Sequence, residues 1–109
     1  MGRDPSGGMS YFAVYALDAP GRGEARATHR PAHRARLRSH AHPVVVHVGG
    51  PLLDPEGAMI GSLLIIEAED AAAVERFVAD DPYALAGVYR SVEIRGFQWG
   101  LGVPEAADG

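Results

Sequence analysis

Two segments of this sequence have the character of strands and carry apolar side chains on both faces. The first, SYFAVYAL at residues 10–17, is rich in the aromatic and branched residues that favour strands. Successive side chains of a strand point to opposite sides, so the set beginning at Phe12 and the set beginning at Tyr11 face apart, yet both are apolar. The segment SLLIIEA at 62–68 repeats this pattern. A sheet built from these strands must therefore be covered on both faces.

The rest of the sequence supplies two further strands and the connections between them. Residues 44–48, VVVHV, and residues 91–99 are predicted as the second and fourth strands, with Gly96 as a candidate bulge in the last one. Gly, Pro and acidic residues predict a loop at 49–57, and a short turn is expected at 83–89.

Two helices are predicted between the strands. Pro31 suits a first helical turn, where its missing N–H costs nothing, and this favours a firm helix over 30–40 after a looser turn. Asp70 is a suitable N-cap for a second helix, because its side chain can accept the free N–H groups of the first turn. The residue before a proline avoids helical dihedral angles, so the second helix should stop near Asp80, ahead of Pro82.

The order β-α-β-β-α-β predicts a ferredoxin-like α+β fold, in which two helices pack on one face of a four-stranded antiparallel sheet. Two helices leave the second apolar face bare, which would be a large exposed patch on a monomer. We therefore expect a homodimer in which a second copy covers that face about a two-fold axis. The alternative is that these side chains lie partly exposed at strand ends. The domain is expected at 10–100, between a flexible leader, 1–9, and a flexible tail, 101–109.

Composition limits the cellular location and the classes of binding partner that we expect for this protein. The chain has no cysteine, which excludes disulfides and thiolate chemistry and makes a cytoplasmic location the default. The longest apolar runs are too short to span a bilayer, so no membrane partner is expected. The net charge of −4 argues against nucleic-acid binding. All ten basic residues are arginine, and six lie between Arg22 and Arg38; this local positive patch suits a small anionic ligand.

His33 is the first candidate for chemistry, because imidazole changes its charge near neutral pH and is the usual general acid or base. A histidine base works best when a carboxylate fixes its tautomer. Glu24 and Asp18 are nearest in sequence but not at helical spacing, and Asp81 lies at a helix end from which a loop can fold back. The alternative is that His33 only packs beside Leu37 on the same helix face.

Several motifs, taken in order, resemble the YciI-like (YCII-related domain) family. They are RPAHRARL from residue 30, GGPLLD from 49, GSLLIIEAED from 61 and DDPYALAGVYRSVEIRGF from 80, and the resemblance extends over about 11–99. It implies a dimeric α+β barrel and a histidine–aspartate pair in a pocket, which residue by residue are His33 and Asp81. Some relatives act as dehydrochlorinases on chlorinated aromatic compounds. The short segment 41–43 and the many arginines near His33 depart from the family pattern.

The resemblance favours a small acid–base enzyme, lyase-like or hydrolase-like, that needs no cofactor. Arg30 is a candidate to hold an anionic oxygen, or else a solvated residue at the helix start. Ser62 can add a hydrogen bond to a substrate or satisfy local backbone, and Tyr83 can line the pocket or only pack. The alternative function is a non-catalytic dimer that binds a small ligand or acts as an accessory subunit.

Other chemistries fit the sequence less well. His29 and His33 are four residues apart, but Pro31 lies between them and no acidic residue is near to complete a metal shell, so no metal is expected. The arginine-rich segment has no aromatic platform for stacking RNA bases. Gly49-Gly50 lacks the spacing of a phosphate-binding loop.

Overall fold

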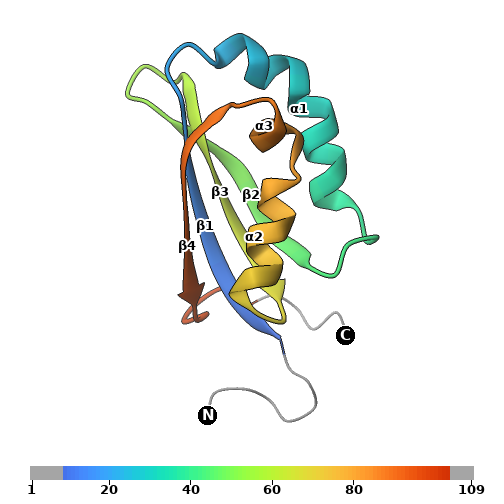
Figure 1. Cartoon of the computed structure of the whole chain (residues 1–109). Coiled ribbons are helices and arrows are strands. Elements are labelled where there is room, and N and C mark those ends of the chain that lie inside the picture. Colours follow the sequence, from blue (N-terminus) through green and yellow to red (C-terminus); the bar gives the residue numbers. More distant parts are fainter. Residues whose placement is uncertain (1–8, 104–109) are drawn as a thin grey trace.

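The computed structural model describes residues 9–103. Residues 1–8 of the predicted leader and 104–109 of the predicted tail lie outside the described residues. Between them the elements follow one another as drawn in Figure 1: β1 (Ser10–Asp18), α1 (Gly23–Arg38), β2 (Val45–Leu53), β3 (Met59–Ala68), α2 (Ala71–Ala79), α3 (Pro82–Leu85) and β4 (Tyr89–Phe97).

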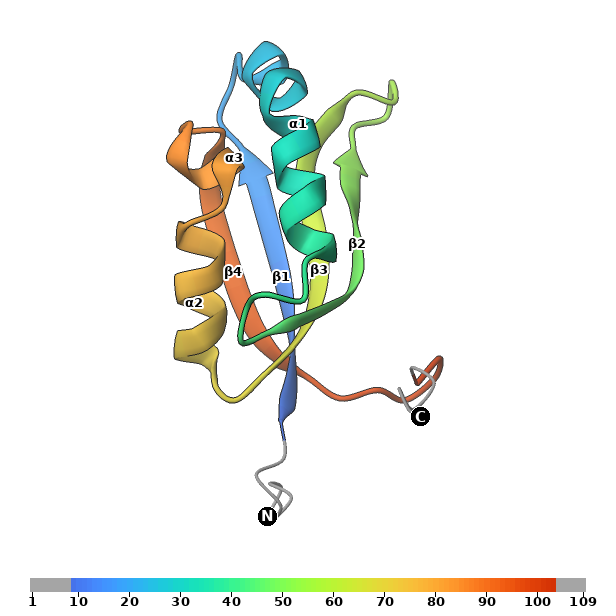
Figure 2. The same cartoon turned by 90° about the vertical axis from the view of Figure 1, so that its right-hand side faces the viewer.

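The four strands form one antiparallel sheet in the order β2-β3-β1-β4, and α1 and α2 lie on the same side of it (Figure 2). This is the predicted ferredoxin-like α+β arrangement, with the short helix α3 added before the last strand. Among the described residues, no helix combines the length and the apolar character needed to cross a membrane.

Helix α1 differs from the prediction at both ends. It begins at Gly23 rather than near residue 30, carries Pro31 inside it, and ends at Arg38 rather than at residue 40. A proline inside a helix removes one backbone hydrogen bond and normally ends or kinks the helix. Here the turns ahead of Pro31 are anchored from outside the helix, because Arg22 Nε donates to the Gly87 carbonyl and Arg26 pairs with Asp18. Tertiary contacts therefore override the local rule.

Strand β2 is also longer than predicted, because it continues through Gly49-Gly50-Pro51, where a loop was expected. It lies at the sheet edge, where proline is tolerated because one row of N–H groups has no ladder partner. A Cβ on Gly49 would come within 3.2 Å of Leu64 and 3.3 Å of Leu37, so glycine lets the edge strand approach the core. The loop shrinks to a tight turn closed by Asp54, whose Oδ1 accepts from the N–H groups of residues 56 and 58.

The second half of the chain follows the prediction more closely. Asp70 caps α2 by accepting from the Ala73 N–H, and α2 ends at Ala79. The predicted turn at 83–89 was wrong in part: α3 occupies its first residues and β4 already begins at Tyr89. The predicted bulge at Gly96 was also wrong. The irregularity in this ladder falls at the other end of β4, opposite Leu17 and Asp18.

The core lies between the sheet and the helices. It contains fully buried side chains from the sheet, such as Val14 and Ile66, and from α2, such as Val74. The opposite sheet face carries Tyr15 and Leu63, which are paired across β1 and β3 and are 46% and 37% exposed. No helix among the described residues covers that face (Figure 2).

Candidate functional site

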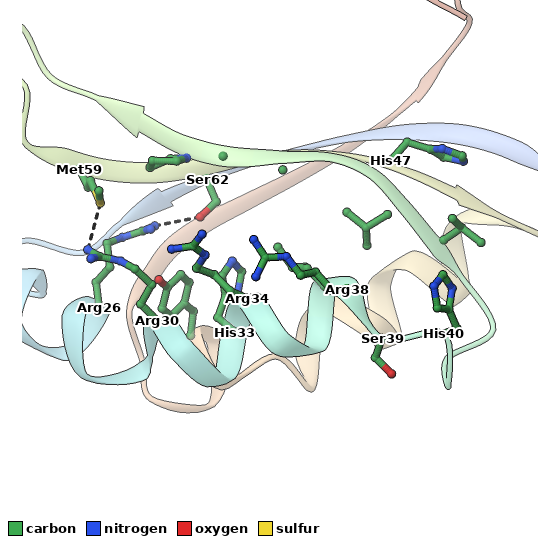
Figure 3. A pocket seen from close by; sticks show the side chains of 17 residues that line it. Arg26, Arg30, His33, Arg34, Arg38, Ser39, His40, His47, Met59 and Ser62 are labelled. Carbon is green, nitrogen blue, oxygen red and sulfur yellow. Dashed lines mark hydrogen bonds between the residues drawn. The ribbon is translucent and has the colours of Figure 1, made fainter. Parts of the chain in front are cut away.

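A cavity of about 510 Å³ lies between α1 and the strand β2. Figure 3 shows the side chains that line it. They include four arginines and three histidines, and within residues 9–103 no Asp or Glu side chain lines the cavity. On a chain of net charge −4, this concentrates positive charge at one place. The basic lining residues are Arg26, Arg30, His33, Arg34, Arg38, His40 and His47.

His33 and Asp81 meet in the structure although 48 residues separate them. His33 Nδ1 lies 2.8 and 2.9 Å from the two carboxylate oxygens of Asp81, and both residues are buried. An Nδ1–H that donates to a carboxylate fixes the neutral ring in one tautomer and leaves Nε2 as an acceptor. His33 lines the cavity while Asp81 lies behind it, so Nε2 is the nitrogen available to a ligand.

Asp81 is held by more than the histidine. It is the N-cap of α3, and its Oδ2 accepts from the Tyr83 N–H at 2.9 Å. Arg36 Nη1 approaches its Oδ1 at 3.6 Å. Arg36 itself is fixed by a 2.7 Å hydrogen bond to the Phe77 carbonyl and by contact with the Phe77 ring. The carboxylate therefore has a fixed orientation and a positive neighbour.

Tyr83 forms a wall of the site and not only of the core. Its ring stacks on the His33 imidazole with centroids 3.9 Å apart and planes inclined by 15°. The Arg26 guanidinium carbon lies 4.5 Å from the centroid of the same ring. The stack with Tyr83 therefore sets the plane of the His33 ring, and the hydrogen bonds to Asp81 set the rotation of the ring within that plane.

A second buried polar group adjoins the cavity and was missed from the sequence. Arg26 forms two hydrogen bonds to the Asp18 carboxylate, at 2.7 and 2.9 Å, and donates to Ser62 Oγ at 2.9 Å. Tyr89 also donates to Ser62 Oγ, at 3.1 Å. The sequence predicted Asp18 in a turn and Arg26 in the looser segment ahead of the helix at 30–40, so their opposite charges were the only signal that linked them.

The protonation of this group follows from its burial and its pairing. Burial opposes the charge of Arg26, but the hydrogen bonds and the charge of Asp18 outweigh it and raise the pKa of Arg26 above the ordinary value. Burial raises the pKa of Tyr89 to about 12, although the hydrogen bond to Ser62 acts in the opposite direction. Arg26 is therefore a cation and Tyr89 a neutral donor at physiological pH.

Four of the five predicted site residues line the cavity, and the fifth, Asp81, supports His33 from behind. Ser62 and Tyr83 are fully buried in its wall. Arg30 is half-buried at its mouth, where its Nη2 donates to Met59 Sδ at 3.1 Å (Figure 3). The structure therefore brings all five predicted side chains together around one cavity.

The histidine pair considered for a metal behaves differently from the expectation. α1 continues through His29 despite Pro31, so His29 and His33 do lie on one regular helix. His29 is not among the residues that line the cavity. In the described part of the chain, no three His, Asp or Glu side chains are grouped as a metal ion would require.

The fold and the site together define a class: a small ferredoxin-like α+β protein with a histidine–aspartate pair at the wall of a cationic cavity. The model of the YCII-related domain matches residues 10–98, and the chain belongs to this family. Protein YciI of Escherichia coli O6:H1 is 34% identical over 93 residues, which cover 80% of this chain and 95% of YciI. An uncharacterized protein of Haemophilus influenzae is 33% identical over 94 residues, covering 81% of this chain and 96% of that protein.

Solved structures extend the comparison. 5-Chloro-2-hydroxyhydroquinone dehydrochlorinase (TftG) from Burkholderia phenoliruptrix AC1100, in complex with 2,5-dihydroxybenzoquinone, is 34% identical with a TM-score of 0.68. The similarity covers 84% of this chain and 95% of that one. A putative antibiotic biosynthesis monooxygenase from Bacteroides thetaiotaomicron shares the fold at 15% identity, with a TM-score of 0.57 over 90% of this chain and 95% of that one.

Proposed function

We propose that this protein is a cofactor-independent acid–base enzyme that acts on a small polar or aromatic substrate by a dehydrochlorinase-like or other lyase-like elimination. One observation carries the proposal: Asp81 holds His33 by Nδ1, so the ring offers Nε2 to the cavity. The similarity to a dehydrochlorinase at 34% identity supports the reaction class. The proposed roles are His33 as base, Asp81 as its orienting carboxylate, and Arg30, Ser62 and Tyr83 as substrate-binding residues.

The proposed step is an elimination of a proton and a leaving group from the substrate. Nε2 of His33 takes a proton from the substrate, the electrons of that bond form a new double bond, and the leaving group departs with its own electron pair. Asp81 stabilises the imidazolium that results. The ring then returns the proton to water, so no oxidant or metal takes part in the step.

Ser62 is suited to hold a substrate oxygen because of its own partners. Its Oγ accepts hydrogen bonds from Arg26 and from Tyr89, and these use both acceptor lone pairs of the hydroxyl. The Ser62 O–H is then left as a donor at the cavity wall. Such a donor, with Arg30 close by, would stabilise negative charge that develops on a substrate oxygen during proton transfer.

We propose further that the protein works as a homodimer through the uncovered sheet face. That face exposes Tyr15 and Leu63, and Phe97 packs edge-on against Trp99 at the end of β4. A second copy packed on this face would bury these side chains.

The test is a turnover screen with chlorinated and hydroxylated hydroquinones, following chloride release and quinone absorbance. His33→Gln keeps the size and polarity of the side chain but has no basic nitrogen, so it should lower turnover by about 100-fold or more. Asp81→Asn should lower it as well and should change the tautomer of His33 in ¹⁵N NMR spectra, whereas Asp80→Asn on the neighbouring exposed carboxylate should change neither. Turnover by His33→Gln at the wild-type rate would refute the proposed mechanism.

A non-catalytic ligand-binding protein is the second candidate. The observation that favours it is the number of cations around the cavity, which exceeds what one proton transfer requires. In that case His33→Gln weakens binding of 2,5-dihydroxybenzoquinone, and the wild-type protein turns over no compound of the screen. Calorimetric titration of both proteins with this quinone separates the two candidates.

A further inference from the structure

The arginines of α1 that line the cavity do not all serve the same purpose. They recur every fourth residue at 26, 30, 34 and 38, and this spacing places all four on one face of the helix. Arg26 is paired with Asp18 inside the protein, and Arg30 donates to the sulfur of Met59. Arg34 and Arg38 make no ion pair within residues 9–103. Two cations therefore face the cavity with uncompensated charge.

The exceptional position of Arg34 and Arg38 is clearest beside Arg36, which lies between them in sequence. Arg36 faces the other side of the helix, where it bonds the Phe77 carbonyl and approaches Asp81. Figure 3 shows Arg34 and Arg38 extending instead from α1 toward the strand that forms the opposite wall, with Met59 at one end of the view, Ser62 between Met59 and Arg38, and His40 near the other end. The helix therefore separates one arginine that supports the dyad from two that face the cavity.

The opposite wall leaves room for a ligand beside these two arginines. β2 contributes Gly49, Gly50 and Pro51 to the cavity, so this part of the wall carries no long side chain and no acidic group. The chain has 14 Asp and Glu residues, yet within residues 9–103 none lines the cavity, so the positive charge there has no acidic neighbour in the wall. A wall with two free guanidinium groups and space opposite them is suited to an anion.

We propose that Arg34 and Arg38 form a second anion-binding subsite, and that the ligand is a hydroxylated aromatic carboxylic acid that spans the cavity. Its hydroxyl lies at Ser62, Arg30 and His33, and its carboxylate lies between Arg34 and Arg38. Guanidinium groups bind carboxylates through paired hydrogen bonds, which gives this end its selectivity. The inference names the substrate class of the proposed enzyme and rests on the same cavity.

The dimensions agree with this class of ligand. Arg38 follows His33 by five residues, a rise of about 7 Å along a helix. A carboxylate carried on the far side of a benzene ring from the reacting hydroxyl spans a similar length. The cavity volume of about 510 Å³ is within the range that holds a small ligand of this kind.

The experiment compares two probes that share a phenol and a two-carbon side chain and differ in the terminal group: 4-hydroxyphenylacetate, which ends in a carboxylate, and 4-hydroxyphenethyl alcohol, which ends in a neutral hydroxyl. Calorimetric titration of the wild-type protein should show the acid binding about tenfold more tightly. The double variant Arg34→Gln/Arg38→Gln should lose that preference through weaker binding of the acid, with binding of the alcohol unchanged. The double variant Arg90→Gln/Arg95→Gln removes two exposed arginines of β4 outside the cavity; it is the control for net charge and should keep the preference.

Each outcome bears on the subsite separately from the proposed reaction. Equal binding of the two probes by the wild-type protein, including no measurable binding of either, would overturn the subsite. The same holds if Arg34→Gln/Arg38→Gln keeps the preference or if Arg90→Gln/Arg95→Gln loses as much of it. Because the measurement is binding, a loss of preference in Arg34→Gln/Arg38→Gln supports the subsite even if the wild-type protein turns over no compound of the screen. Circular dichroism spectra of all variants show whether the fold is retained.

Discussion

The ring of Tyr83 stacks on the imidazole of His33 at 3.9 Å, and its own backbone N–H is bonded to the aspartate that orients that imidazole. One short helix, α3, therefore supplies both the carboxylate and the stacking surface. His33 reaches this pair from α1. The geometry of the dyad thus depends on how α3 packs against α1, and substitutions at Tyr83 should affect His33 without touching its ligand-facing nitrogen.

We expect Tyr83→Leu to destabilise the protein by about 2–4 kcal/mol, because it removes a buried aromatic ring and its stacking contact. Tyr83→Phe keeps the ring and should cost about 1 kcal/mol or less. Urea unfolding measures both values, and NMR of the His33 ring reports its environment. The leucine variant should broaden or shift the His33 signals while the phenylalanine variant preserves them. Identical His33 spectra in the two variants would show that the stack does not position the ring.

Arg26 should be among the most costly side chains to remove. Its ion pair with Asp18 is buried, with side chains 3% and 8% exposed. Arg26→Met leaves the Asp18 carboxylate buried without its partner, and loss of one member of such a pair costs about 3–5 kcal/mol. The double variant Arg26→Met/Asp18→Asn removes the stranded charge and should recover part of this loss.

Chemical denaturation of the two single variants and the double variant forms a complete cycle. Arg90→Met is the matched control, since Arg90 is exposed and should change stability by about 0.5 kcal/mol or less. Strictly additive losses for Arg26 and Asp18 would mean that the pair does not act as a unit.

The two buried pairs, His33 with Asp81 and Arg26 with Asp18, show which contacts can be predicted from the sequence and which cannot. The β-α-β-β-α-β order, the two-faced strands and the cap at Asp70 follow from local patterns, so they were predictable. The meeting of His33 and Asp81 was expected only because the motifs resemble a known family, since no spacing rule joins residues so far apart. The pair of Asp18 and Arg26 lies only eight residues apart and was still missed, because pairing across a turn depends on the angle between strand and helix.

The predicted start of α1 and the predicted end of β2 were wrong for the same physical reason. Pro31 and the Gly49-Gly50-Pro51 segment carry strong local signals for a helix start and a loop. The structure overrides both, through anchors outside the helix in the first case and through pairing of an edge strand with β3 in the second. The local penalties of glycine and proline in a helix are about 1 and about 3 kcal/mol per residue, so a few tertiary contacts are sufficient to offset penalties of this size.

Tyr89 should give stability a distinct dependence on alkaline pH. Its folded-state pKa is raised from 10.0 to about 12, so the unfolded chain releases this proton first as pH rises. The contribution is therefore complete below pH 10.0 and is lost as pH rises toward about 12. A shift of this size corresponds to at most about 3 kcal/mol.

Absorbance titration of the tyrosines provides the measurement for Tyr89. The wild-type protein has four tyrosines and should show one step near pH 12 that is absent in Tyr89→Phe. The stability difference between the two proteins, measured by urea unfolding, should also shrink between pH 10.0 and about 12. A constant difference across this interval would show that Tyr89 titrates normally.

The uncovered sheet face leads to the last prediction, a dimer that depends on Tyr15 and Leu63. These two side chains lie opposite each other on β1 and β3, and both remain exposed in a single chain. A glutamate at either position would place a charge in the proposed interface, where its desolvation opposes association. Sedimentation equilibrium at micromolar concentration should give a dimer for the wild-type protein and a folded monomer for Leu63→Glu.

The matched control for this experiment is Leu85→Glu, because Leu85 is 72% exposed on α3 and lies away from the uncovered face. This variant adds the same charge to the chain and should remain a dimer. Burial of a face of this kind normally stabilises a small domain, so Leu63→Glu should also unfold at lower urea concentration than Leu85→Glu. A wild-type protein that sediments as a stable single copy would instead mean that both apolar faces are tolerated without a partner, and the second face would need another explanation.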